Sequence, residues 1–417
     1  MFGLGNPLSQ KRERLFTVLD IGTESIKVLN CLVQGKEVEI LGKGVAMQNV
    51  GEMENGAITD IAGVIEKCHL AMRDADRMSG SVPQQMIVGI AGELIKGATS
   101  TVTYKRRDPG SKIHLEELRN IIHKVQWKAF EKVRGDLAHE TGFNEIDVKL
   151  VYASIVDTRI DGYKVANPIG FQGREVMMSV FNAFSPIVHF GALQTISAEM
   201  DRELIAIMAE PYAVGRLLGG TELQGYSGIF LDIGGSATDI SVVIDGSVVG
   251  TKMFNLGGRA FTKRLSKALN VSHYEAEEVK TAFSLNQLEH QSHNIVGKAL
   301  ASDTEIWLSG VYFSLQELSD IDSLPPTVYL CGGGSLLPLL KEGLEGSDWY
   351  KNLPFPRKPQ VKYLLPKNIS HIKDKTGTID SPIDIAPIAL ASTGMEIMTE
   401  EKTLTKMLQK VVRLMQV

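Results

Sequence analysis

Apolar runs and glycine-bearing turns alternate along this chain, and their periods predict strands and helices in a repeated order. A meander of three strands is predicted over 16–48, followed by a helix over 61–78 whose apolar residues share one face. The order restarts with a hairpin at 229–235, strands as far as residue 254 and then helices. The pattern therefore predicts an α/β protein built from two halves on one plan.

A block with a different rhythm interrupts the first half. Between residues 93 and 172 a strand, a basic turn at 105–110 and a long helix over 115–140 precede two more short strands. We interpret this block as an inserted α/β module. The basic turn, Lys-Arg-Arg-Asp-Pro-Gly, is either a solvated loop or a contact for an anionic partner.

Each half carries an Asp-Ile-Gly turn at the tip of a predicted hairpin. The two segments are Phe16-Thr-Val-Leu-Asp-Ile-Gly-Thr23 and Ile229-Phe-Leu-Asp-Ile-Gly-Gly-Ser236. Glycine allows close approach of the backbone to a ligand, and successive N–H groups at such a tip can hold phosphate. Asp20 and Asp232 would then face a phosphate-bound Mg²⁺ through water, because Mg²⁺ keeps much of its hydration shell. One such turn is compatible with an ordinary hairpin, whereas two in equivalent halves indicate a duplicated domain closing on one nucleotide.

Three further features are candidates for the same site. The run Gly332-Gly333-Gly334 joins a predicted buried strand to a helix, so that it either serves turn geometry or aims a helix N-terminus at an anion. Glu210, before Pro211, either positions water for attack on a terminal phosphate or is a first-turn acid favoured by the helix dipole. Glu277 and Lys280 share a helix face and form either nucleoside contacts or a plain ion pair.

Size and composition narrow the class of protein. With 417 residues the chain exceeds the usual size of a single core, and its 43% hydrophobic and 22% charged residues are typical of a globular protein. The net charge of −5 gives no reason to expect nucleic-acid binding. The cysteines, Cys31, Cys68 and Cys331, are far apart and suggest buried thiols in a reducing compartment. The N-terminus does not resemble a secretory signal, and no apolar run is long enough to span a membrane.

The last segment is predicted to be an amphipathic helix over 403–417. Its apolar side carries Leu, Met and Val, and its other side carries Lys and Arg. Such a helix either lies at a membrane surface or packs on the protein's own core.

The order of these motifs resembles the actin/Hsp70/hexokinase superfamily of nucleotide-binding proteins. The resemblance implies a duplicated, ribonuclease H-like ATPase fold. It also implies a first phosphate loop at Asp20-Ile-Gly-Thr23 with Lys27, a second at Asp232–Asp239, a water-positioning acid at Glu210 and an adenosine loop at Gly332–Ser335. The implied ligands are ATP and Mg²⁺. The implied contacts are Asp20, Gly22, Thr23, Lys27, Glu210, Asp232, Gly234, Gly235, Ser236, Glu277, Lys280, Gly332, Gly333, Gly334 and Ser335.

Within that superfamily the chain resembles the FtsA family of bacterial cell division. The resemblance rests on Gly56–Asp60, Val88–Gly92, Asn167–Gly173, Leu256–Gly258 and Glu275–Lys280. It implies an FtsA-type (SHS2-like) insertion, self-association into filaments, and contacts with an FtsZ-like ring protein and other division proteins. It also implies a cytoplasmic protein held on the inner face of the membrane by its C-terminal helix.

The resemblance divides the chain into five parts. They are a first actin-like subdomain (1–85 and 173–209), the insertion (86–172), a second actin-like subdomain (210–254 and 325–399), a small helical nucleotide-side subdomain (255–324) and the amphipathic helix (400–417).

Some positions depart from the family pattern. Ser236-Ala237 replaces a Gly-Thr pair, so at most slow ATP hydrolysis is expected. Residues 281–326 lack the usual strand pair, and little linker precedes the last helix. The pilus-assembly protein PilM shares the fold and the insertion, and a small-molecule kinase of the superfamily is a further alternative.

Overall fold

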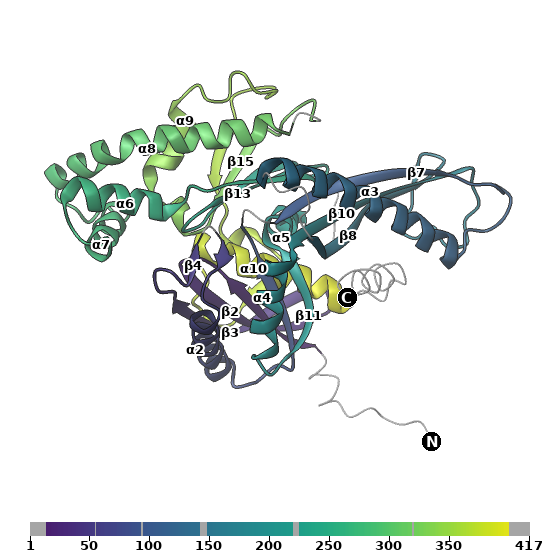
Figure 1. Cartoon of the computed structure of the whole chain (residues 1–417), viewed down its shortest axis with the longest axis horizontal. Coiled ribbons are helices and arrows are strands. Elements are labelled where there is room, and N and C mark those ends of the chain that lie inside the picture. Colours follow the sequence, from purple (N-terminus) through teal and green to yellow (C-terminus); the bar gives the residue numbers. More distant parts are fainter. Residues whose placement is uncertain are drawn as a thin grey trace.

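The protein is built on two large β-sheets with helices packed against them (Figure 1). The computed structural model describes residues 14–54, 56–92, 95–141, 148–219, 225–318 and 321–399. The amphipathic helix expected over 400–417 lies outside these ranges. Within them, no helix has both the length and the apolar composition needed to cross a bilayer.

The first sheet has six strands in the order β11-β6-β1-β2-β3-β17. Its predicted meander is confirmed, since β1 pairs antiparallel with β2 and β2 with β3. The crossover strands β6 and β11 add in parallel on the other side of β1. The strands are β1 (Leu15–Ile21), β2 (Ser25–Gln34), β3 (Glu37–Met47), β6 (Gln85–Ile90), β11 (Glu203–Ala209) and β17 (Ile372–Asp374).

Two helices, α2 (Ile61–Ser79) and α10 (Ile385–Thr399), pack on this sheet. Glycine lets α2 approach closely, because a Cβ at Gly44 would lie 1.8 Å from the carbonyl oxygen of Ala71. The predicted helix start is also confirmed: the Asp60 carboxylate accepts hydrogen bonds from the first-turn N–H groups of Ala62 and Gly63. We call this sheet with its helices lobe I.

The second sheet has nine strands in the order β16-β15-β12-β13-β14-β7-β10-β8-β9. The hairpin of β12 and β13 repeats the β1–β2 hairpin, and β15 runs parallel to β12. The strands are β7 (Lys96–Lys105), β8 (Val148–Ile160), β9 (Tyr163–Lys164), β10 (Glu175–Pro186), β12 (Gly228–Ile233), β13 (Thr238–Ile244), β14 (Ser247–Phe254), β15 (Thr327–Cys331) and β16 (Gln360–Tyr363). A small separate sheet pairs β4 (Met53–Glu54) with β5 (Ala57–Ile58).

The β12–β16 half of this sheet carries its own helices, and we call it lobe II. Its core contains Trp307 of α8, Phe261 of α6 and Leu340 of α9. The helices are α6 (Gly258–Leu269), α7 (His273–Ser284), α8 (His290–Gln316) and α9 (Pro338–Gly346). The short helix α5 (Glu210–Arg216) packs against both α10 and the β12–β14 strands, so that it connects the lobes.

The inserted block forms the other half of the nine-stranded sheet and extends away from the lobes (Figure 1). Its helix α3 (Leu115–Thr141) covers β7 and β10 over a separate core. Strand β10 pairs with β7 and β8, although the expected boundary at residue 172 assigns it to the first subdomain. The pairing of β10 therefore places it in the same sheet as the strands of the insertion. Helix α4 (Ile187–Ala198) follows β10 and contacts α2.

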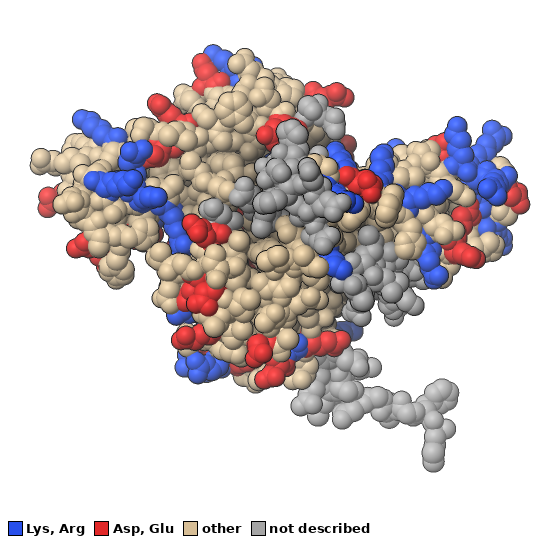
Figure 2. All heavy atoms as spheres, viewed as in Figure 1, with Lys and Arg blue, Asp and Glu red and all other residues tan. Residues whose placement is uncertain are grey.

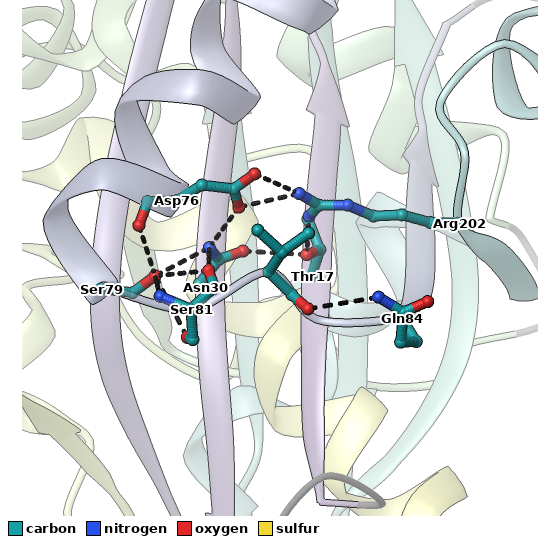
Figure 3. Close-up of polar contacts among 8 residues, drawn as sticks. Thr17, Asn30, Asp76, Ser79, Ser81, Gln84 and Arg202 are labelled. Atoms are coloured by element: carbon teal, nitrogen blue, oxygen red, sulfur yellow. Dashed lines mark hydrogen bonds and ion pairs between the residues drawn. The ribbon is translucent and has the colours of Figure 1, made fainter.

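A buried polar network fixes the base of lobe I (Figure 3). The Arg202 guanidinium donates to both carboxylate oxygens of Asp76 at 2.7 and 2.6 Å, and to the hydroxyl of Thr17. Asn30 accepts from Thr17 at 2.8 Å and donates to Asp76 at 2.8 Å. These bonds join β1, β2 and the end of α2 to the segment before β11. Because the Arg202 side chain is only 3% exposed, its charge depends on Asp76 for compensation.

Candidate functional site

A cleft of about 450 Å³ lies between the two lobes, where the two hairpin tips meet. Both Asp-Ile-Gly turns line it, as do the start of α5, the glycine loop after β15 and helix α7. Nearly all of the residues predicted from the sequence reach this one cleft. They are Asp20, Gly22, Thr23, Lys27, Glu210, Asp232, Gly234, Gly235, Ser236, Glu277, Lys280, Gly332, Gly333 and Gly334.

The two hairpin tips touch each other. The hydroxyl groups of Thr23 and Ser236 lie 2.9 Å apart, joined by a hydrogen bond between residues that are far apart in sequence. Asp20 lies opposite Lys27 in the β1–β2 register, as Asp232 lies opposite Asp239 in the β12–β13 register. Equivalent hairpins from the two lobes therefore form the floor of one cleft.

Lys27 is the central cation of this floor. Its Nζ lies 3.1 Å from Oδ2 of Asp20, which is almost completely buried. Burial lowers the pKa of Lys27, but the hydrogen bond to Asp20 and the charges of Asp20, Asp232 and Glu210 together raise it by more, so the net pKa lies above the ordinary value. Lys27 therefore stays protonated and provides a positive charge for an anionic ligand.

Glu210 is a buried acid with an unsatisfied oxygen. It follows β11 directly and starts α5, and its Oε1 lacks a hydrogen-bond partner among the described residues. Burial raises the pKa of Glu210 well above its ordinary value, and the negative charges of Asp20 and Asp232 raise it further. A buried polar atom without a partner usually marks a place for water or a ligand, and Glu210 is one of the residues that line the cleft.

Asp232 and Asp239 belong to the same negatively charged wall. Burial raises the pKa of Asp232 to about 6, with Lys27 opposing and Asp20 adding to the shift. Burial and the charge of Asp232 raise the pKa of Asp239 well above its ordinary value. Asp239 belongs to the second Asp-Ile-Gly motif but was not among the site residues predicted from the sequence. Its position opposite Asp232 in the β12–β13 hairpin is the signal that could have identified it.

The glycine loop after β15 needs its first glycine. Gly332 has φ +79°, and a Cβ there would lie 2.2 Å from Oδ1 of Asp232. The predicted helix does not start at once, because Gly333–Leu336 forms a 3₁₀ turn and α9 begins at Pro338. Ser335 is fully buried below the loop and donates its hydroxyl to the Gly332 carbonyl at 2.7 Å. It supports the loop and, unlike its glycine neighbours, is not part of the cleft wall.

Glu277 and Lys280 form an ion pair, which was one of the two roles that the sequence allowed for them. Lys280 Nζ lies 2.7 Å from Glu277 Oε2 and also donates to Thr262 and to the carbonyl of Gly258. Both residues still line the cleft. The pair therefore fastens α7 to α6 and remains accessible to a ligand in the cleft.

Arg259 is a cleft residue that sequence reasoning missed. It is the second residue of α6, and its side chain reaches across to lobe I. Its Nε lies 2.7 Å from Oε2 of Glu24, the residue after the first Asp-Ile-Gly-Thr segment. No spacing rule connects residues so far apart, and only the fold brings them together.

The comparisons with known proteins agree with this fold. The family model described as "Cell division protein FtsA" matches residues 229–376. "Cell division protein FtsA" of Bacillus subtilis (strain 168) is 26% identical over 268 residues, which cover 64% of this chain and 57% of that protein. The FtsA protein of Neisseria meningitidis serogroup B is 24% identical over 278 residues, 66% of this chain and 63% of that protein.

A solved structure, the "PilM-PilN type IV pilus biogenesis complex", is similar with a TM-score of 0.66 at 14% identity. The match covers 91% of this chain and 98% of that one, and it shows the shared fold. In sequence the chain is similar to FtsA proteins, and its fold is the actin-like ATPase fold. The matched region spans about three fifths of the length of the two curated relatives.

The insertion carries many basic side chains (Figure 2). In the basic turn, Lys105 and Arg107 are exposed, whereas Arg106 is buried. Arg106 donates to both carboxylate oxygens of Glu117 at 2.8 and 2.9 Å, and to the carbonyls of Ser111 and Gly173. The middle of the turn is therefore a structural anchor, whereas its flanks are exposed.

Proposed function

We propose that this FtsA-like chain is an ATP-binding, actin-like assembly protein of bacterial cell division. It would hold a ring of an FtsZ-like protein at the cytoplasmic face of the membrane and recruit other division proteins. The observation that carries the proposal is the convergence of both Asp-Ile-Gly hairpins, the Gly332 loop and Glu210 on one interlobe cleft. The similarity to FtsA proteins over 229–376 and beyond supports the biological role.

The side chains of the cleft fit a magnesium nucleotide. The described residues contain no group of three His, Cys, Asp or Glu side chains positioned to hold a metal ion by themselves. Asp20 and Asp232 are nevertheless hard oxygen donors beside a predicted phosphate position, which suits Mg²⁺ held through its own waters. When bound, Mg²⁺ would neutralise phosphate charge, and the Gly332–Gly334 loop, Glu277 and Lys280 would surround the nucleoside.

Slow hydrolysis is expected from the residues at the phosphate end of the cleft. Glu210 lines the cleft, where its carboxyl group can orient an attacking water by a hydrogen bond. Ala237, in the cleft wall, offers no hydroxyl to phosphate or metal. Nucleotide binding, more than turnover, would then favour a closed, filament-competent arrangement of the lobes, since a ligand shifts populations toward the state that it binds better.

A vesicle experiment tests the tethering role. The full chain and a chain ending at Thr399 are each mixed with anionic vesicles, Mg-ATP and the FtsZ-like protein of the same organism. We expect the full chain to bring the ring protein down with the vesicles, and the shortened chain to leave it in solution with its thermal stability unchanged. Each basic residue of the predicted C-terminal helix would add about 1 kcal/mol of attraction at an anionic surface, so high salt should weaken the effect.

Two results would contradict this role. Loss of stability on truncation without lipid binding by either chain would place the last helix in the core. Normal division with lost pili after gene deletion would favour a platform like that of the pilus complex whose fold is similar.

A further inference from the structure

Arg259 bridges the mouth of the cleft at its phosphate end. From the start of α6 in lobe II it donates to two acceptors in lobe I, Glu24 Oε2 at 2.7 Å and the Thr23 carbonyl at 3.0 Å, and to the Met53 carbonyl of β4 at 3.4 Å. One side chain thus joins lobe II both to the first hairpin tip and to β4. Its planar fork of N–H donors suits several acceptors at once.

Glu24 fits against the opposite hairpin as well as against Arg259. A Cβ placed on Gly235 would lie 3.2 Å from Glu24 Oε2 and 3.3 Å from Glu24 Cβ, so the two tips are in close contact. The adjacent Thr23–Ser236 hydroxyl contact of 2.9 Å closes the same end. The Glu24 side chain is 40% exposed and that of Arg259 19%, so the pair lies at the rim, where water can separate it.

We propose that the Glu24–Arg259 pair is a latch that closes the phosphate end of the cleft and controls how fast nucleotide leaves. The inference rests on the proposed function, because it takes the ligand to be a nucleotide. The phosphates would lie at the hairpin tips, so their release requires the tips to part. The Arg259 contacts must break first, and the barrier to release rises accordingly.

The latch differs from direct phosphate binding by Arg259. As a phosphate ligand, Arg259 would have to leave Glu24, and removing the Glu24 charge would free it and tighten binding. As a latch, Arg259 acts through Glu24, and removing that charge loosens the cleft. The two roles therefore predict opposite effects of Glu24→Gln on nucleotide release.

Stopped-flow release of a fluorescent ADP analogue tests the latch in the full chain. We expect Glu24→Gln to speed release about five- to tenfold, the scale of one charge-assisted contact. Arg259→Gln should speed it at least as much because it loses all three contacts. Adding Glu24→Gln to Arg259→Gln should then change nothing further. The matched control is Glu317→Gln, which breaks a 2.6 Å surface pair with Lys252 away from the cleft.

Hydrogen exchange of the nucleotide-free chain provides a second readout. The tip segments 21–26 and 234–237 should exchange faster in Glu24→Gln and Arg259→Gln but not in Glu317→Gln. Unchanged or slower release in Glu24→Gln, or additive effects in the double variant, would overturn the latch. If the wild-type chain bound no nucleotide, the proposed function would fail. Exchange at the tips would then still decide whether the pair holds the lobes together.

Discussion

Replacing Asp232 with Asn should make the nucleotide-free protein more stable while weakening its binding of Mg-ATP. Asp232 is half-buried in the cleft wall, and burial raises its pKa to about 6 from an ordinary value of 3.8. When the pKa of a carboxyl group is higher in the folded than in the unfolded protein, the group stabilises the fold at pH values below its pKa in the unfolded chain. That contribution is lost as the pH rises through the pKa in the folded protein. The charged form at neutral pH is therefore a cost that Asn does not carry.

The expected size follows from that shift. A shift of roughly two units corresponds to about 3 kcal/mol, and partial exposure to the cleft reduces this to on the order of 1–2 kcal/mol. We expect Asp232→Asn to raise the free energy of unfolding by this amount at pH 8 and to leave it nearly unchanged at pH 4. Magnesium-dependent ATP affinity should fall at least tenfold, a loss of about 1.4 kcal/mol.

Urea unfolding at several pH values, followed by circular dichroism, measures the first effect, and calorimetric titration measures the second. Asp380→Asn, at an exposed position, is the matched control and should show neither effect. A less stable Asp232→Asn protein at pH 8, or a gain equally large at pH 4, would refute the account of the raised pKa.

Three further substitutions test the fold and the cleft. Asp76→Ala should lower the free energy of unfolding by about 3–5 kcal/mol in urea titrations, because it leaves the Arg202 charge buried and unpaired; pairing it with Arg202→Leu should restore much of the loss. Glu210→Gln should reduce the residual phosphate release measured over hours yet keep ATP affinity within about twofold, whereas a large affinity loss would make it a binding residue. Gly332→Ala should abolish nucleotide binding in calorimetry because its Cβ would overlap a carboxylate of the second hairpin, while Gly346→Ala, with no atom within 4 Å of its added Cβ, should bind normally.

The sequence predicted those elements whose determinants are local. The two apolar runs on either side of Asp-Ile-Gly are enough to define the hairpin of β1 and β2. Asp60 marks the start of α2 because its side chain accepts hydrogen bonds from the first turn of that helix. The candidate site was predictable for a related reason. The glycines and acidic residues of the two Asp-Ile-Gly turns lie at strand ends, where the sequence alone can place them. Because the chain repeats one plan twice, the two turns meet at one cleft.

What the sequence could not supply was pairing between distant segments. The hydrophobic pattern of β10 would suit a strand in either of the two large sheets. Only its hydrogen-bonded pairing with β7 and β8 assigns it to the sheet of the insertion. The Arg259–Glu24 pair depends on how the lobes meet, and nothing near either residue indicates its partner. Ser335 was expected at the cleft from the resemblance to the adenosine loop, but it lies in a 3₁₀ turn and is fully buried.

Calorimetric titration of the nucleotide-free full chain with ATP, in Mg²⁺ and then in EDTA, tests the central claim most directly. If the interlobe cleft is a magnesium-nucleotide site, one ATP should bind per chain, and the affinity should fall at least tenfold in EDTA, a loss of about 1.4 kcal/mol. Asp20→Asn should reproduce much of that loss in the presence of Mg²⁺. No binding heat, or binding that neither EDTA nor Asp20→Asn alters, would contradict the account.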